Sequence, residues 1–184
     1  MAEDGENDAR ERFAGAMVSV EASVVAVELE ALEEIIGEPD IKSLNSIPLG
    51  KIMQCVREDE GELISIVKLA VTNESEGEIT REESVNEKRK VSNDDVGEQE
   101  VRENRVSFRV VPRIMEADRI IVNFDLKQIA SENNLASERQ AEEQEERVIQ
   151  FEVSSEVVLR PGKPRVVAAT KKDEAIFLIM EVDI

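Results

Sequence analysis

Apolar and polar residues alternate along several stretches of this chain, and the first long one is Met17–Leu29. Side chains on a β-strand point to opposite faces in turn, so alternation predicts a strand with one buried face. In this stretch that face carries Val18, Val20 and Val24. The second half of the other face is apolar too, which favours a central strand covered on both faces.

The most regular alternation lies at Arg105–Met115, where Val106, Phe108 and Val110 share one face. A short polar turn and a second alternating run follow, and this succession predicts a β-hairpin. Because proline has no N–H to donate to a neighbouring strand, Pro112 predicts an edge position or a bulge.

The last stretch, Phe151–Ile184, predicts three consecutive strands. The first ends at Arg160-Pro161-Gly162-Lys163-Pro164, where proline and glycine suit the second and third positions of a β-turn. A return strand and a second polar break follow. The final strand then carries a row of apolar side chains on one face, among them Ile176, Leu178 and Met180.

Two short helices are predicted after the first strand. The first covers residues 29–36 and ends at Gly37, because glycine commonly follows a helix C-terminus. The second shows an amphipathic stripe, with Ser46 as its N-cap and Gly61 just past its end, where the next alternating strand begins. Cys55 lies beside the stripe and is predicted to be a small residue half under the helix.

Three segments are polar throughout. Residues 1–16 are acidic and predict a disordered lead-in. Residues 78–104 predict an excursion: a hairpin arm or a mobile loop up to Val91, then an acidic loop from Ser92. Residues 131–147 are rich in Glu and predict a second solvated excursion, helical or disordered.

These elements predict an α+β fold with a mainly antiparallel β-sheet of about seven strands and two short helices packed on it. Strands and helices do not alternate in βαβ units, which argues against a parallel doubly wound sheet. We expect one β-rich domain over residues 17–184.

Charge and composition narrow the function. Asp and Glu number 42 against 23 Lys and Arg, for a net charge of −19, so phosphates would be repelled and nucleic acid is not expected as a partner. The chain has no His, the commonest general base and metal ligand, and its single Cys excludes a cysteine-pair metal site. The chain has no apolar run of about 20 residues, so no transmembrane helix is predicted.

The sequence contains no catalytic motif. Its pairs of adjacent acids lie in polar runs, which usually form solvated faces rather than a pocket that separates two pKa values. A Gly-rich phosphate loop and a nucleophile elbow are also missing. We therefore predict a non-enzymatic protein that needs no cofactor or metal.

The order of elements resembles the C-terminal core of the secretins, the bacterial type II and III secretion system proteins. Residues 18–27, VSVEASVVAV, are similar to the family's opening strand, V-x-V-x-A-x-(I/V)-x-E-V, with Ala26 in place of the acid. Residues 106–114, VSFRVVPRI, are similar to the family's L-x-V-x-P-x-I. Residues 157–167 and 175–184 are similar to its closing strand–turn–strand and last strand.

The resemblance implies a structural subunit of a homo-oligomeric ring or a larger secretion- or envelope-type assembly, in which neighbouring copies extend one another's sheets through edge strands. The candidate assembly residues are Val18, Val20, Val24, Val106, Phe108, Val110, Ile176, Leu178 and Met180. It also implies the periplasm or cell envelope, after removal of a leader. The acidic N-terminus is not a signal peptide, and without the resemblance we expect a cytoplasmic protein.

The chain departs from the family in two respects. The family's V-P-x-L-G-D-I-P-x-L-G-x-L-F loop is missing between Thr170 and Ala175. With no Trp or Tyr, the chain also lacks the aromatic girdle that outer-membrane proteins place at both membrane interfaces. These departures predict a reduced, soluble variant.

A second hypothesis depends on charge alone. In it the chain is a monomeric acidic binding module that meets a basic partner through Glu142, Glu143, Glu145 and Glu146.

Overall fold

The computed structural model describes residues 12–37, 44–89, 98–116, 118–135 and 146–184. The elements in chain order are β1 (Met17–Glu28), α2 (Leu29–Ile36), α4 (Leu49–Arg57), β2 (Gly61–Thr72), β3 (Gly77–Arg89), β4 (Glu98–Glu116), β5 (Arg119–Leu135), β6 (Glu146–Leu159), β7 (Arg165–Lys171) and β8 (Glu174–Asp183). Within these ranges, no helix has the length and apolar content that a membrane crossing requires.

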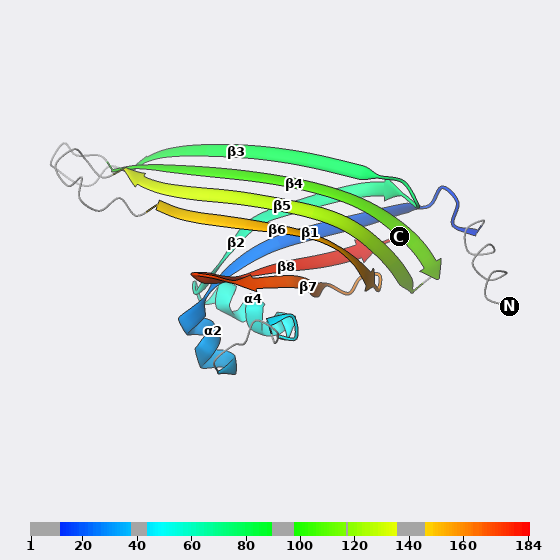
Figure 1. Cartoon of the computed structure of the whole chain (residues 1–184), viewed down its shortest axis with the longest axis horizontal. Coiled ribbons are helices and arrows are strands. Elements are labelled where there is room, and N and C mark those ends of the chain that lie inside the picture. The colour runs from blue at the N-terminus through cyan, green and yellow to red at the C-terminus, as the bar shows by residue number, and fades with distance from the viewer. Residues whose placement is uncertain (1–11, 38–43, 90–97, 117, 136–145) are drawn as a thin grey trace.

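The eight described strands form two antiparallel sheets of four, which corrects the predicted single sheet of about seven. The long sheet has the order β3-β4-β5-β6, and the helix-covered sheet has the order β2-β1-β8-β7. Figure 1 shows the two sheets stacked, with α2 and α4 below the helix-covered sheet. The mainly antiparallel character and the two short helices are confirmed.

The main core lies between the two sheets. Every second residue of β1 from Val18 to Ala26 faces it, and the same alternation in β4 buries Val106, Phe108 and Val110. Removing this aliphatic surface from water is the main term that stabilises the sandwich. Since the chain has no Trp or Tyr, this packing depends on Val, Ile, Leu and Phe.

A second, smaller core lies between the helix-covered sheet and its helices. Val25 and Val27 of β1 and Phe177 of β8 pack there with Leu32 of α2 and Ile52 of α4. Strand β1 is therefore covered on both faces and paired on both edges, as its two apolar faces predicted.

The two helices differ in how well the sequence predicted their ends. Helix α2 is followed by Gly37, whose φ of 77° glycine adopts without strain, so the predicted C-terminus is confirmed. The prediction of Ser46 as the N-cap of α4 is wrong. Pro48 takes that position, and no side chain caps the helix. Cys55 of α4 is fully buried rather than half covered, and burial first, then the charge of Glu60, raises the pKa of its thiol.

Much of the predicted polar excursions is β-strand. Residues 77–89 form β3, as the hairpin-arm alternative predicted, and the predicted acidic loop is wrong from Glu98 onward. Strand β5 likewise extends to Leu135. The long sheet runs past the end of the helix-covered sheet (Figure 1), so these strands have no second sheet beneath them and show no apolar face in the sequence. Residues 1–11 of the predicted lead-in lie outside the described residues.

Pro112 lies in an inner strand, because β4 pairs with β3 and β5. The β3 ladder, however, begins only at Gly77 opposite Val110, so Pro112 lies beyond its end. The Pro112 carbonyl accepts a 2.8 Å hydrogen bond from the Glu74 backbone N–H. The N and C=O of one strand residue point to the same side, so the missing donor leaves the β4–β5 ladder intact. Pro112 therefore lies at an unpaired edge of β4, as predicted, although β4 as a whole is an inner strand.

Candidate functional site

The nine predicted assembly residues are buried in the core between the sheets: Val18, Val20, Val24, Val106, Phe108, Val110, Ile176, Leu178 and Met180. They belong to β1, β4 and β8, and each of these strands lies between two others. The sheet order therefore corrects the prediction that these strands are open edges. A role for these side chains in assembly stays a prediction.

The open edges belong to β2 and β7 in the helix-covered sheet and to β3 and β6 in the long sheet. Strand β2 packs against β3 and β4, whereas β6 packs against β7 and β8. The open edges therefore fall on two sides of the sandwich. We call β2 with β3 the first flank, and β6 with β7 the second flank.

Large apolar side chains remain exposed on both flanks. Val85 of β3 is 47% exposed and Val158 of β6 is 50% exposed. Leu63 and Ile66 of β2 and Val148 of β6 are exposed as well. Among the described side chains, the inner strands β4 and β5 carry no comparably exposed large apolar residue. Exposed apolar residues on an unpaired edge are typical of a surface that another chain covers.

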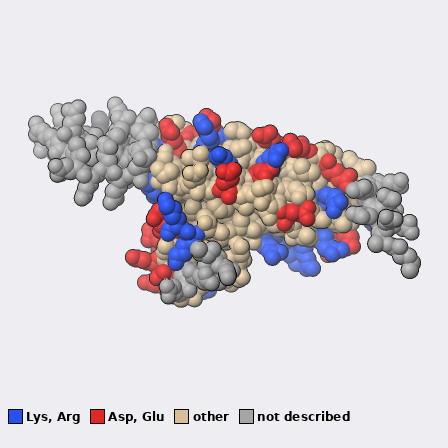
Figure 2. All heavy atoms as spheres, in the orientation of Figure 1, with Lys and Arg blue, Asp and Glu red and all other residues tan. Residues whose placement is uncertain are grey.

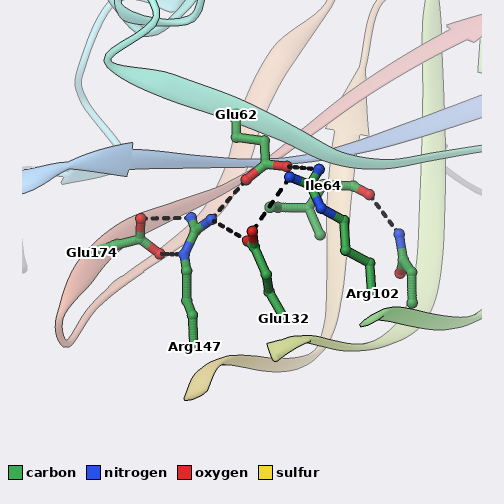
Figure 3. Close-up of polar contacts among 7 residues, drawn as sticks. Glu62, Ile64, Arg102, Glu132, Arg147 and Glu174 are labelled. Carbon is green, nitrogen blue, oxygen red and sulfur yellow. Dashed lines mark hydrogen bonds and ion pairs between the residues drawn. The ribbon is translucent and has the colours of Figure 1, made fainter. Parts of the chain in front are cut away.

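Five charged side chains join the two sheets at the end of the helix-covered sheet, and we call them the charged clasp: Glu62, Arg102, Glu132, Arg147 and Glu174 (Figure 3). Arg147 of β6 donates to both oxygens of Glu174, at 2.6 and 3.1 Å, and to Glu62 at 2.8 Å. Arg102 of β4 donates to Glu132 at 3.3 Å and lies 4.0 Å from Glu62.

The environment of Arg147 favours its charged form. Partial burial opposes that form, but hydrogen bonds to Glu174 and Glu62 outweigh the burial and raise the pKa of the guanidinium above its ordinary value. Glu62 and Glu174 belong to the helix-covered sheet, and Arg147 belongs to the long sheet. The clasp therefore covers the polar end of the sandwich core.

A neutral network continues from the clasp into the core around Gln128, which is fully buried. Its amide nitrogen donates to Asn104 Oδ1 at 2.5 Å, and its oxygen accepts from the Ser65 hydroxyl at 2.5 Å. Asn104 in turn donates to the Ile64 carbonyl at 2.7 Å. Among the described side chains, no buried polar atom lacks a hydrogen-bond partner. The network ties β2 to β4 and β5.

The clasp borders a cavity of about 80 Å³ between Glu62, Ile64, Asn104, Glu132 and Arg147. Each acid of the charged clasp has an arginine partner. Such paired charges hold the two sheets together. Among the described residues, no group of three or more His, Cys, Asp or Glu side chains is placed to bind a metal ion. The cavity is thus the interior of a structural junction.

The outer face of the long sheet carries cross-strand polar contacts. Arg109 of β4 donates to Asp125 of β5 at 2.5 and 3.0 Å, and Ser154 of β6 donates to the same carboxylate. The Ser154 bond first, and then the Arg109 bond, lower the pKa of Asp125. The Asp125 bond in turn raises the pKa of Arg109. The outer face of the long sheet is therefore polar, as expected for a face in contact with water.

No protein-family model matches the chain. No curated protein matches it either. A solved structure, the single-particle cryo-electron microscopy structure of the V. cholerae type IV competence pilus secretin PilQ, is similar with a TM-score of 0.44 and 10% identity. The match covers 91% of this chain and 61% of that one, so this chain spans less than two thirds of that secretin's length. At this distance the likeness assigns neither a family nor a function.

The predicted acidic surface falls mostly outside the described residues. Glu142, Glu143 and Glu145 lie there, and Glu146 is the first residue of β6. The acidic interaction surface therefore stays a prediction. Sequence reasoning missed the charged clasp because Arg102, Glu132 and Arg147 fell in stretches that looked like polar excursions. The available signal was the position of Arg147, two residues before the buried Ile149 of an alternating run.

Proposed function

We propose that this chain is a non-catalytic structural protein that self-associates flank to flank within a secretin-like, secretion- or envelope-type assembly. The observation that carries the proposal is the placement of the open edges. Each of the two sheets has one open edge on the first flank and one on the second. A single contact between the first flank of one copy and the second flank of the next would extend both sheets together.

The strand order supports this geometry. All neighbouring strands within each sheet are antiparallel, and each sheet has four of them. With an even number, a copy placed beside the first in the same orientation sets its β3 antiparallel to β6, and its β2 antiparallel to β7. Such a head-to-tail contact repeats, and it generates a closed ring or an open filament according to the rotation between copies.

The edge strands of the long sheet are well suited to pairing. β3 and β6 have 13 and 14 residues, long for open edges of a monomeric protein. Within the described part of the chain, neither strand contains a proline, the residue that blocks edge pairing most directly. The exposed Val85 and Val158 lie on these same strands. An edge of this kind is protected when another strand pairs with it.

A pair of proline variants tests the proposal. Successive residues of a strand direct their N–H groups to opposite sides, so either Ser84 or Val85 of β3 points its N–H to the open side. Ser84→Pro and Val85→Pro should therefore differ. One variant loses a bond of the β3–β4 ladder and unfolds at lower temperature. The other keeps the β3–β4 ladder, melts like a dilute wild-type sample that has not assembled, and loses self-association.

The measurement is light scattering coupled to size-exclusion chromatography, together with thermal unfolding of each variant. Thr80→Ser, which keeps the backbone donor of an exposed β3 residue, is the control and should assemble like the wild type. A wild-type chain that stays at its monomer mass of 20.6 kDa at all protein and salt concentrations contradicts the proposal. The monomeric acidic module that meets a basic partner would then be the hypothesis to test.

A further inference from the structure

A group of basic side chains lies at the turn between β6 and β7, which we call the basic turn: Arg160, Lys163 and Arg165. All three are exposed, and among the described residues none of them has an ion-pair partner. They line a hollow of about 420 Å³ with Arg119, which pairs with Glu116 at 2.7 Å. Figure 2 shows basic side chains gathered along the lower edge of the molecule, where Figure 1 places this turn. The chain as a whole carries a net charge of −19.

The backbone holds the basic turn in place. Gly162, with a φ of 65°, donates a 2.9 Å hydrogen bond to the Val182 carbonyl of β8. Lys163 donates to the Arg160 carbonyl at 3.2 Å, which closes the turn. Because the turn is tied to the helix-covered sheet, its three cations keep their position at the end of the second flank.

The turn between β2 and β3, at the end of the first flank, has the opposite charge. It carries Glu74 and Glu76, and Glu78 follows at the start of β3; all three are exposed. Glu76 lies 3.8 Å from Arg109, so part of its charge is compensated within the chain. We call these three residues the acidic turn.

Strand pairing puts the two turns at the same end of the molecule. Leu159, next to the basic turn, pairs with Ile120 of β5, and Ile120 pairs with Ile114 of β4. The Ile114 N–H donates to Asn73 Oδ1 at 2.8 Å, and Asn73 adjoins the acidic turn. A row of paired residues across the long sheet therefore joins Leu159, just before the basic turn, to Asn73, just before the acidic turn.

We infer that, in the assembly, the basic turn of one copy contacts the acidic turn of the next copy. This inference rests on the proposed flank-to-flank association and names the contact that aligns it. Through Arg109 and Asp125, Glu78 is level with Ser154 of β6, so a translation across the sheets needs a shift along the strands towards Arg160 to bring the two turns together. Copies with a net charge of −19 repel one another, and a local contact between opposite charges offsets that repulsion and selects the register.

Charge reversal tests the contact with the full chain. Arg160→Glu with Lys163→Glu should weaken self-association at least about tenfold near 0.1 M salt, because like charges then face each other. Glu76→Lys with Glu78→Lys should weaken it similarly. Lys51→Glu with Arg57→Glu on α4 is the control matched to the first pair, since it also replaces a lysine and an arginine with glutamates but lies outside both turns. Thermal unfolding checks that every variant is folded.

The decisive sample is an equimolar mixture of the two weakened double variants, examined by light scattering. One has acid at both turns and the other has base at both, so alternating copies restore every contact and the wild-type mass should return. If both double variants assemble like the wild type, the turn contact is overturned while flank-to-flank association stands. If the mixture stays dissociated, the contact is overturned as well. A wild type that is monomeric throughout overturns the association and the contact together.

Discussion

Asn104 of β4 donates a 2.7 Å hydrogen bond to the backbone carbonyl of Ile64 in β2. The ladder between β1 and β2 passes from Leu63 to Ser65, so Ile64 is the extra residue of a β-bulge. The long sheet thus supplies the partner for a carbonyl at the one irregular point of this ladder. This bond fixes how the two sheets, and with them the two open edges of each flank, sit over one another.

Asn104→Ala should destabilise the protein by about 1–3 kcal/mol, because the Ile64 carbonyl and the buried Gln128 amide both lose a partner. Urea unfolding measures the change. Asn123→Ala, on the exposed face of β5, is the control and should change the stability by less than about 0.5 kcal/mol. Equal losses in the two variants would show that the network does not hold the sheets together.

Arg147→Met should cost about 1–2 kcal/mol, because Glu62, Glu174 and Glu132, which lies 3.8 Å from Arg147, lose a shared cation. The side chain is 38% exposed, so solvent screening keeps the loss below that for a fully buried pair. Arg105→Met removes a more exposed pair, with Glu82, and should cost less than about 1 kcal/mol. The comparison uses chemical unfolding at one salt concentration, and no difference between the variants would contradict a structural role for the clasp.

Asp125 predicts a defined pH dependence. Its pKa in the folded protein is lower than its ordinary value, so its contribution to stability is fully present above about pH 3.9. That contribution is lost as the pH falls through the pKa of Asp125 in the folded protein. The carboxylate that accepts hydrogen bonds from Ser154 and Arg109 then becomes protonated. The stability gap between wild type and Asp125→Asn should therefore be constant at neutral pH and shrink below about pH 4. A gap that is the same at pH 3 and pH 7 would rule this out.

Gly77→Ala should destabilise the protein by about 1–3 kcal/mol, because the added methyl would overlap a methyl group of Val71. Gly50→Ala is a control of opposite sign. This residue lies in α4 with open space around it, so alanine should stabilise the helix by about 0.5–1 kcal/mol. Thermal unfolding of both variants measures these changes. A Gly77→Ala variant with the wild-type melting temperature would show that β2 and β3 approach less closely at the first flank.

The alternation of apolar and polar residues predicted most strands well where the inner faces of the two sheets meet. Val18, Val20 and Val24 alternate because a second sheet covers them, and Phe108 and Val110 do so for the same reason. The pattern shows that a face is buried, but it does not say what buries it. A single sheet covered by helices and a sandwich of two sheets give the same alternation, so the number of sheets was wrongly predicted.

Alternation also fails where a strand is not covered. The outer parts of β3, β4 and β5 run past the helix-covered sheet, so these parts show no apolar face in the sequence and looked like loops (Figure 1). Arg102, Glu132 and Arg147 lie at the border of that region, and only the packing of the two sheets brings them together. The open edges follow from strand order, which depends on contacts between residues far apart in the sequence.

Backbone hydrogen exchange at several protein concentrations tests the central claim, flank-to-flank pairing, most directly. The account predicts that amides of the edge strands β3 and β6 become slower to exchange as the protein assembles, while those of α2 and α4 do not change. Strands β4 and β5, already paired on both edges, should change little. Exchange in β3 and β6 that is independent of concentration, in a sample whose mass shows assembly, would contradict the account.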